Sequence, residues 1–251
     1  MTPCSGKSNP GQSCSPTPAR ALLLIFAKEP VPGQVKTRLS PPLSPAQAAE
    51  LYRCFLADVM EEMARLSGVD LAVAHDPAPA RDFFAALAPP GTRLVPQARG
   101  NLGRRLKEAV DWGFSLGYPA VLVRNSDSPD LPGEFVREGA EALLAGRADA
   151  VLGPCPDGGY YLVGLRQPCP ELFQQVAWST PAVLQQTLER AGEVGLQVHL
   201  LPPWPDIDDL AGLRRFARRP HSPPAAGWRS HAWLDEHFFS PLPESAGTAP
   251  E

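Results

Sequence analysis

The sequence predicts an α/β protein with a three-layer α/β/α arrangement around a mostly parallel, mixed sheet. Apolar runs of strand length alternate with helical patterns along the chain, which is typical of right-handed crossovers between parallel strands. The first run, residues 21–27, is apolar throughout, as expected for a strand covered on both faces. Residues 150–152 and 160–165 are joined by a glycine-bearing loop too short for a helical crossover, so at least one strand is expected to be antiparallel.

The expected elements follow one another in a regular order. After the first strand, Ser44, Pro45 and Gln47 supply an N-cap, a first-turn proline and a capping-box partner for a long amphipathic helix that continues to Leu66. Thr180 and Pro181 mark another helix start. Further strands are expected at 71–74, 93–95, 120–123, 150–152, 160–165 and 196–201, and further helices at 80–87, 102–116, 135–144, 180–188 and 210–216.

The length of 251 residues suits one substantial domain, expected at residues 20–219. Residues 1–19 are rich in Pro, Ser and Gly and are expected to form a disordered tail. The segment 220–251 is a Pro-rich extension, expected to be partly packed as a short amphipathic helix before Ser240 and disordered beyond Pro241. Its aromatic residues are Trp228, Trp233, Phe238 and Phe239.

Composition narrows the class of function. A net charge of −4 argues against a surface that grips nucleic acid. The run 21–27 is too short to span a bilayer, and five cysteines without a C-x-x-C pair indicate reduced thiols. The histidines are dispersed and there is no Gly-x-Ser-x-Gly motif, which disfavours serine or cysteine hydrolase chemistry. We therefore expect a cytoplasmic protein that contacts neither nucleic acid nor the membrane interior.

An aspartate directly follows the buried run 120–123. Asp127 is expected at the carboxyl end of a central strand, where open α/β sheets bind ligands and where a hard divalent cation finds oxygen donors. A turn or helix-capping role is the alternative, and Asp130 fits that role better. Asp127 is thus the first candidate for a metal or substrate residue.

A basic loop follows the first strand. Gly33 allows close backbone approach to an anion, and Lys36 and Arg38, with Thr37 between them, can neutralise a diphosphate. The loop lacks the first glycine and the Gly-Lys pair of a P-loop. A solvated basic turn explains this loop equally well.

Two further acidic segments follow later strands. Asp157, Gly158 and Gly159 precede two tyrosines in a hairpin-like loop. The glycines permit close approach of a sugar or acceptor, and Asp157 could act as a base. An ordinary turn is the alternative explanation of the same residues. Asp206 and Asp208 alternate in an extended segment, which suits shared coordination of Mg²⁺ or Mn²⁺. One of the acids at 206–209 is expected to cap the following helix.

Five ordered motifs together resemble a known family. The similarity spans about residues 22–216 and is to DUF2064, often described as radical-SAM/selenodomain-associated or arsenosugar-biosynthesis glycosyltransferases. That family is similar to the nucleotide-diphospho-sugar transferase (GT-A) fold, which also includes guanylyltransferases. The motifs are Pro32-Gly33-x-Val35-Lys36-Thr37-Arg38-Leu39, Leu102-Gly103-x-Arg105, Ser126-Asp127-Ser128-Pro129-Asp130-Leu131-Pro132, Gly153-Pro154-x-x-Asp157-Gly158-Gly159-Tyr160-Tyr161 and Asp206-Ile207-Asp208.

The resemblance implies roles for these residues. Lys36 and Arg38 would hold donor phosphates, and Asp127 would bind the metal together with Asp206 or Asp208. Gly158 and Gly159 would lie near the sugar or acceptor, and the segment carrying Gly103 and Arg105 near the nucleotide or acceptor. Asn125 stands where the family pattern has glycine, which a left-handed backbone would accommodate.

The function expected on this basis is metal-dependent transfer from a nucleotide-activated donor to a small-molecule acceptor. A glycosyltransferase acting on a nucleotide-diphospho-sugar is the first hypothesis. A nucleotidyltransferase that uses a nucleoside triphosphate and releases pyrophosphate is the alternative within the same site. A non-catalytic nucleotide-binding module, with acids as helix caps and glycines as turns, is the alternative of another class.

Overall fold

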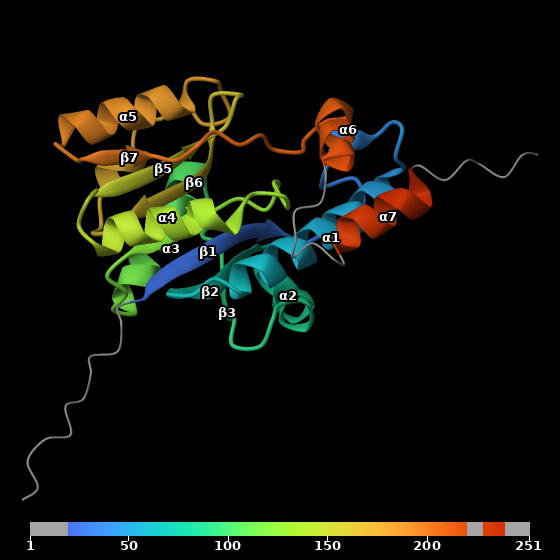
Figure 1. Cartoon of the computed structure of the whole chain (residues 1–251), viewed down its shortest axis with the longest axis horizontal. Helices are drawn as coiled ribbons and strands as arrows, with labels where there is room; N and C mark the ends of the chain where they lie inside the picture. Colours follow the sequence, from blue (N-terminus) through green and yellow to red (C-terminus); the bar gives the residue numbers. More distant parts are fainter. Residues whose placement is uncertain (1–19, 220–227, 239–251) are drawn as a thin grey trace, which may run out of the picture.

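A computed structural model describes residues 20–219 and 228–238. They form a seven-stranded sheet between two layers of helices (Figure 1). The strands are β1 (Ala21–Lys28), β2 (Val69–Asp76), β3 (Arg93–Pro96), β4 (Val121–Arg124), β5 (Ala150–Pro154), β6 (Tyr160–Leu165) and β7 (Val198–Leu200). The helices are α1 (Pro45–Ala64), α2 (Arg81–Leu87), α3 (Leu102–Ser115), α4 (Gly133–Leu144), α5 (Val183–Glu193), α6 (Leu210–Arg218) and α7 (Arg229–His237), with short 3-10 turns at Thr37–Leu39, Ala78–Ala80 and Pro170–Phe173.

The strand order is β3-β2-β1-β4-β6-β5-β7. β6 pairs antiparallel with both β4 and β5, whereas the other neighbouring strands run parallel. The short loop before β6 reverses the chain, as its length predicts. The predicted three-layer fold with a mostly parallel, mixed sheet is confirmed.

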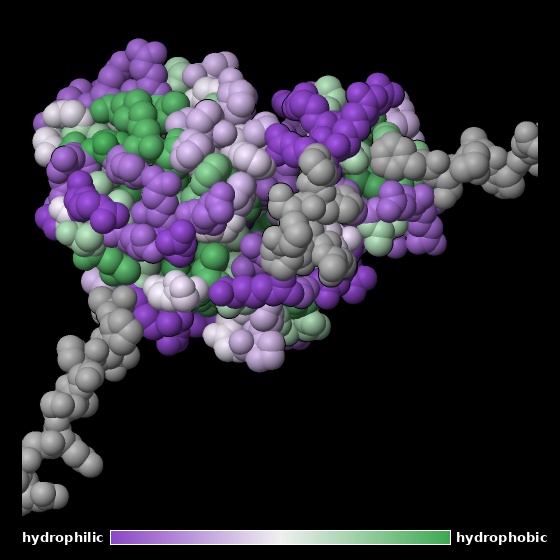
Figure 2. All heavy atoms as spheres, viewed as in Figure 1, coloured by the Kyte–Doolittle hydropathy of each residue, from purple (hydrophilic) through white to green (hydrophobic). Residues whose placement is uncertain are grey.

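Both faces of the sheet are buried, and alternate residues of each strand face opposite layers. In β1, Leu23 and Ile25 pack into a core with α1, α2, α4, α6 and α7, whereas Leu22 and Leu24 pack into a second core with α3 and α5. This double burial explains why the strand is apolar at every position. Outside these cores, Figure 2 shows a hydrophilic surface over α4 and α6, with hydrophobic side chains gathered around edge strand β7.

Helix and strand boundaries follow local signals closely. The capping box of α1 is formed as predicted: the Ser44 hydroxyl accepts from the Gln47 N–H at 3.2 Å, and the Gln47 side chain accepts from the Ser44 N–H at 2.9 Å. α5 begins at Val183, with Ala182 as its N-cap residue, and thus starts later than Thr180-Pro181 predicts. The Thr180 hydroxyl still accepts a hydrogen bond from the Ala182 N–H at 3.3 Å.

The C-terminal extension contributes helix α7, which lies along α1 (Figure 1). Asp58 of α1 accepts hydrogen bonds from the N–H groups of Arg229 and Ser230, both at 2.9 Å, and from the Ser230 hydroxyl at 2.5 Å. A carboxylate of one helix thereby satisfies the free N–H groups of another. The predicted disorder of 1–19 and beyond Pro241, and the placement of Phe239, lie outside the described residues.

The expectations about membrane-spanning segments and cysteines can be compared with the described residues. Within residues 20–219 and 228–238, no helix combines the length and apolar character needed to cross a membrane. Cys54, Cys155 and Cys169 are free thiols in the same part of the chain.

Candidate active site

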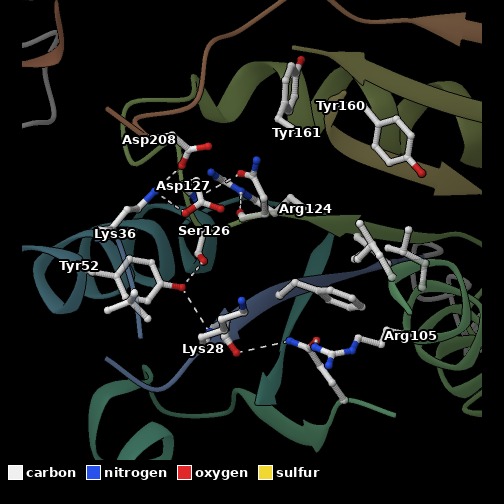
Figure 3. A pocket seen from close by; sticks show the side chains of 18 of the residues that line it. Lys28, Lys36, Tyr52, Arg105, Arg124, Ser126, Asp127, Tyr160, Tyr161 and Asp208 are labelled. Atoms are coloured by element: carbon white, nitrogen blue, oxygen red, sulfur yellow. Dashed lines mark hydrogen bonds and ion pairs between the residues drawn. The ribbon is translucent and has the colours of Figure 1, made fainter. Parts of the chain in front are cut away.

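A pocket of about 630 Å³ opens at the carboxyl ends of β1 and β4 (Figure 3). This is the edge at which open α/β sheets place their ligands. Its wall combines the loop after β1, the first turn of α3, the segment after β4 and the start of β6. The lining residues that concern the site are Lys28, Lys36, Thr37, Arg38, Tyr52, Gln97, Arg105, Arg124, Ser126, Asp127, Tyr160, Tyr161 and Asp208.

Lys36 brings two of the predicted acids together. Its ammonium lies 2.5 Å from Asp127 Oδ1 and 3.0 Å from Asp208 Oδ1, and it donates to the Ile207 carbonyl at 2.8 Å. Because one nitrogen contacts both carboxylate oxygens, these oxygens lie at most about 5.5 Å apart. The predicted convergence of Asp127 with the 206–208 segment is therefore present in the fold (Figure 3).

The environment of Lys36 keeps its charge. Its side chain is 4% exposed and lies over the rings of Tyr52 and Phe55, 5.8 and 5.9 Å from their centroids. Burial alone would lower the pKa of Lys36, but the charges of Asp127 and Asp208 outweigh it and hold the pKa above its ordinary value. The Lys36 ammonium thus contacts the two acids and the Ile207 carbonyl. From the sequence, it was expected to contact a donor phosphate instead.

Asp206 is placed differently from Asp208. Its Oδ1 accepts hydrogen bonds from Asn125 Nδ2 at 2.8 Å and Ser128 Oγ at 2.7 Å, and the Cys155 thiol lies 3.6 Å away. Burial, followed by the charge of Asp127, raises the pKa of Asp206 to about 6. Asp208 lines the pocket and its side chain is 48% exposed, so of the two predicted acids Asp208 faces ligand space.

The predicted phosphate-binding loop lines the pocket in part. Thr37 and Arg38 are exposed at its wall, and Arg38 makes no ion pair within the described residues. Gly33 has a φ of 77° and open space around it, which is the conformation that favours glycine, but it lies outside the lining. The backbone of Lys36 is also left-handed, with a φ of 47°, and this directs its side chain inward.

Arg105 lies in the first turn of α3 and reaches the pocket. Its guanidinium donates to Asp76 Oδ2 at 3.1 Å, to Gln97 Oε1 at 3.3 Å and to the Gly100 carbonyl at 3.1 Å. Gly103 is on the other side of the same turn, where a Cβ would lie 2.6 Å from the Phe173 carbonyl oxygen. Arg105 is thus at the pocket as predicted, whereas Gly103 allows close packing behind it.

The hairpin loop after β5 lies outside the pocket lining. Asp157 is exposed, and its Oδ1 accepts a hydrogen bond from the Gly159 N–H at 2.9 Å. A Cβ at Gly158 would lie 2.1 Å from the Pro181 carbonyl oxygen, and its φ of 90° also favours glycine. Asp157, Gly158 and Gly159 therefore occupy turn positions, the alternative interpretation of this loop, and none of them contacts the acid pair.

Two local expectations need correction, whereas the expectation that one of the acids at 206–209 caps the following helix is confirmed. Asn125 does not have the positive φ of the left-handed region. Its side chain donates to Asp206, and its N–H donates to the Tyr161 carbonyl at 3.0 Å. Asp130 lies in a turn, as expected, but does not cap α4: it accepts from Trp204 Nε1 at 3.2 Å and pairs with Arg219. Asp209 is the acid that caps α6, accepting from the Gly212 N–H at 2.7 Å.

Sequence reasoning missed two residues of the pocket. Tyr52 of α1 shares a 2.7 Å hydrogen bond with Ser126, and its hydroxyl accepts from the Lys28 N–H at 3.2 Å. Burial raises the pKa of Tyr52 to about 12, so it stays a neutral phenol. Arg124 is a buried arginine at the end of β4. An arginine closing an otherwise apolar strand is the signal that could have revealed it.

The donor set can be compared with what Mg²⁺ or Mn²⁺ requires. Within the described residues, no group of three or more His, Cys, Asp or Glu side chains could hold an ion alone. Mg²⁺, however, is commonly held by one or two carboxylates together with waters and substrate phosphates. Asp127 and Asp208, with side chains 35% and 48% exposed, offer such a pair of oxygen donors. The residues fit a cation that binds together with a phosphate ligand.

Comparisons with other proteins agree with this fold. The model of the family described as "Uncharacterized protein conserved in bacteria (DUF2064)" matches residues 59–180. The crystal structure of a "putative nucleotide-diphospho-sugar transferase" from Desulfovibrio desulfuricans G20 is 34% identical, with a TM-score of 0.79, over 87% of this chain and 95% of that one. No curated protein matches by sequence.

More distant solved structures share the fold alone. One is CMP:2-keto-3-deoxy-manno-octonic acid synthetase complexed with CTP, at 14% identity and a TM-score of 0.52, over 79% of this chain and 97% of that one. Another is 4-diphosphocytidyl-2C-methyl-D-erythritol synthase from Anaerococcus prevotii DSM 20548, at 10% identity and a TM-score of 0.53, over 86% and 96%. The sequence motifs, the sheet topology and the 34% identical relative together show that the chain belongs to the DUF2064 family, within the nucleotide-diphospho-sugar transferase superfamily.

Proposed function

We propose that this protein is a Mg²⁺- or Mn²⁺-dependent glycosyltransferase that uses a nucleotide-diphospho-sugar as donor. One observation carries the proposal: Asp127 and Asp208 come from different segments and place carboxylate oxygens within about 5.5 Å of each other in a pocket that also contains Arg38. Two carboxylates that share a pocket with a guanidinium unpaired within the described residues suit a cation and its diphosphate. The name of the 34% identical relative supports the same class of transferase.

The charges of the pocket favour a diphosphate diester. Lys28 and Arg38 line the wall without an ion pair among the described residues, whereas Arg105 is paired with Asp76. A nucleotide-diphospho-sugar carries two phosphate charges, which two such cations can balance. A nucleoside triphosphate carries more charge and would depend more heavily on the divalent ion.

The chain's own residues would position the donor. Arg38 would bind phosphate oxygens in fork geometry, and Tyr52, kept neutral, would fix Ser126 and the backbone of Lys28 beside the acids. The cation would offset charge on the departing nucleoside diphosphate. Asp157 takes no part in this proposal because it is exposed in a turn outside the pocket lining.

A thermal-shift panel of nucleotide sugars, nucleoside diphosphates and nucleoside triphosphates, with and without Mn²⁺, tests the binding part. Ligands that bind the folded state raise Tm by mass action. Asp127→Asn should remove the Mn²⁺ dependence, and Asp157→Asn is the matched control that should keep it. Arg38→Met should weaken donor binding by about tenfold or more. Arg53→Met, at an exposed position of α1, should not.

Analysis of the products tests the reaction. Release of nucleoside diphosphate supports glycosyl transfer, whereas release of pyrophosphate from a nucleoside triphosphate would assign nucleotidyl transfer to the same pocket. If Asp127→Asn left nucleotide affinity equally sensitive to Mn²⁺, the acids would not be the metal site. Nucleotide binding that is insensitive to Mn²⁺, with neither product released, would instead favour the non-catalytic binding module.

A further inference from the structure

A buried arginine closes the turn that carries Asp127. Arg124 is 1% exposed; its Nε donates to the Asn125 carbonyl at 2.9 Å and its Nη2 to the Ser128 carbonyl at 2.7 Å. These carbonyls stand at the two ends of the segment 125–128, so one guanidinium fixes its shape. Nη1 of Arg124 is buried and has no hydrogen-bond partner among residues 20–219 and 228–238. A buried charge with an unmet donor is unfavourable unless nearby charge compensates for it.

Asp206 supplies that compensating charge. Burial lowers the pKa of Arg124 to about 10, and among the groups that oppose this effect Asp206 is the strongest, followed by Asp130. Arg124 and Asp206 bind the same two residues, Asn125 and Ser128, although no hydrogen bond joins them directly. The charge of Asp206 thereby reduces the electrostatic penalty of burying the guanidinium.

Asp206 also joins two segments that are far apart in the sequence. Its Oδ1 accepts from Asn125 and Ser128, on either side of Asp127. A backbone hydrogen bond of 2.9 Å runs parallel to this link, from the Ile207 N–H to the Asp127 carbonyl. Asp208 follows directly, so the link holds Asp127 and Asp208 next to each other.

Asp206 is less suited than Asp208 to hold a cation, because it does not line the pocket and one of its oxygens is engaged in hydrogen bonds. Its Oδ1 already accepts two hydrogen bonds, with the Cys155 thiol nearby. Asp208, two residues on, lies at the pocket wall. The two acids of the Asp-Ile-Asp motif therefore differ in what surrounds them, which their spacing in the sequence does not reveal.

We propose that Arg124 and Asp206 are positioning residues that set the spacing of Asp127 and Asp208, and that Asp206 is not itself a metal ligand. The inference rests on the proposed function, in which Asp127 and Asp208 hold the cation with the donor diphosphate. Arg124 shapes the turn from inside the core. Asp206 ties that turn to the segment that carries Asp208.

Asparagine substitutions separate the two roles. Asp206→Asn keeps an Oδ1 that can accept from Asn125 and Ser128, whereas an amide is a much poorer ligand for a hard cation. We expect Asp206→Asn to weaken Mn²⁺ affinity by less than about tenfold and Asp208→Asn to weaken it by more. Affinity would be measured by Mn²⁺ titration followed by electron paramagnetic resonance, with the nucleoside diphosphate that most raises Tm. Equal large losses from both variants would overturn the inference.

A variant that frees Asp206 gives opposite expectations. Replacing both Asn125 and Ser128 by alanine removes two hydrogen-bond donors but no carboxylate. If Asp206 is a positioning residue, Mn²⁺ affinity falls by about tenfold or more, as for the loss of an outer-shell partner. If Asp206 were a ligand, its released carboxylate would bind as well or more tightly, and the inference would be wrong.

A double-mutant cycle on folding separates this inference from the proposed function. The unfolding equilibrium constants of Arg124→Met, Asp206→Asn and the double variant would be compared by urea denaturation without metal or nucleotide. Coupled residues should make the double variant depart from the product of the single effects by at least about threefold. Independent effects of the two substitutions would refute the joint positioning role of Arg124 and Asp206, even if the protein binds nucleotides. If the two substitutions are coupled but the protein shows no Mn²⁺-dependent nucleotide binding, the positioning role of Arg124 and Asp206 stands and the proposed transferase function is refuted.

Discussion

Replacing Lys36 by methionine tests whether the acid pair is a cation site. In the structure the Lys36 ammonium contacts Asp127 and Asp208 and lies over the rings of Tyr52 and Phe55. Methionine retains most of the apolar stem but removes the charge. The two carboxylates would then face each other at about 5.5 Å or less without a neutralising group.

The size of the effect follows from this separation. Two unit charges about 5.5 Å apart repel by roughly 3 kcal/mol at an effective dielectric constant of about 20, and by roughly 0.8 kcal/mol in bulk water. The carboxylate side chains are 35% and 48% exposed, so solvent screens them and the lower half of this range applies. A loss of about 1 to 2 kcal/mol corresponds to a Tm lower by about 2 to 8 °C for a domain of this size.

A divalent cation should reverse this loss. We expect Mn²⁺ to raise the Tm of Lys36→Met by several degrees more than that of the wild type, because the ion takes the place of the ammonium in the variant and competes with it in the wild type. Differential scanning fluorimetry with a Mn²⁺ titration measures both effects. Lys28→Met is the matched control, since Lys28 lines the pocket but pairs with neither acid. An equal Mn²⁺ shift in the wild type and Lys36→Met would refute the reasoning.

Three further predictions concern the scaffold. Gly158→Ala should lower Tm by roughly 5 to 15 °C without changing nucleotide affinity, because a Cβ would lie 2.1 Å from the Pro181 carbonyl oxygen; Gly117→Ala, with a φ of 86° and open space, separates backbone strain from this clash. Asp58→Ala should lower the free energy of unfolding by about 1 to 3 kcal/mol and speed amide exchange in α7, since three hydrogen bonds to the first turn of α7 are lost. Unchanged amide exchange in α7 would contradict the packing of α7 on α1 through Asp58. A hydrogen bond from the Gln197 N–H and the ion pair with Arg166 lower the pKa of Asp149. The stability that the ionised Asp149 contributes is therefore present above the ordinary carboxyl pKa and is lost as pH falls. The difference in urea midpoint between wild type and Asp149→Ala should therefore shrink below about pH 4, and a constant difference would exclude this linkage.

Local sequence patterns predicted most of the architecture. The apolar run 21–27 predicts a strand buried on both faces because each alternate side chain must pack into a different layer. Ser44 and Gln47 predict the start of α1 because their hydrogen bonds close within one turn of chain. The boundaries of α5 and β7 were less accurate: α5 begins at Val183 and not at residue 180, and β7 spans Val198–Leu200 and not 196–201. A three-residue strand such as β7 gives a weak periodic signal.

The site was only partly predictable. Asp127 and Arg38 reach the pocket as expected, because residues that follow parallel strands meet at one edge of the sheet. Asp157, Gly158 and Gly159 do not reach it, since β6 lies between β4 and the strand that their loop follows, β5. The sequence could not distinguish a turn glycine from a ligand-contacting one, as both positions require freedom from a side chain.

The sequence by itself determined which segments become strands and helices, and which charged residues stand at the strand ends, because those properties depend on periodicity and on neighbours within a few residues. Tertiary structure alone decided the pairing. The contacts of Lys36 with Asp208 and of Asn125 with Asp206 join residues 172 and 81 positions apart. Hydrogen bonds and ion pairs depend on distances of a few ångströms, so only the folded chain determines that Asp208 faces the pocket while Asp206 and Arg124 hold it in place.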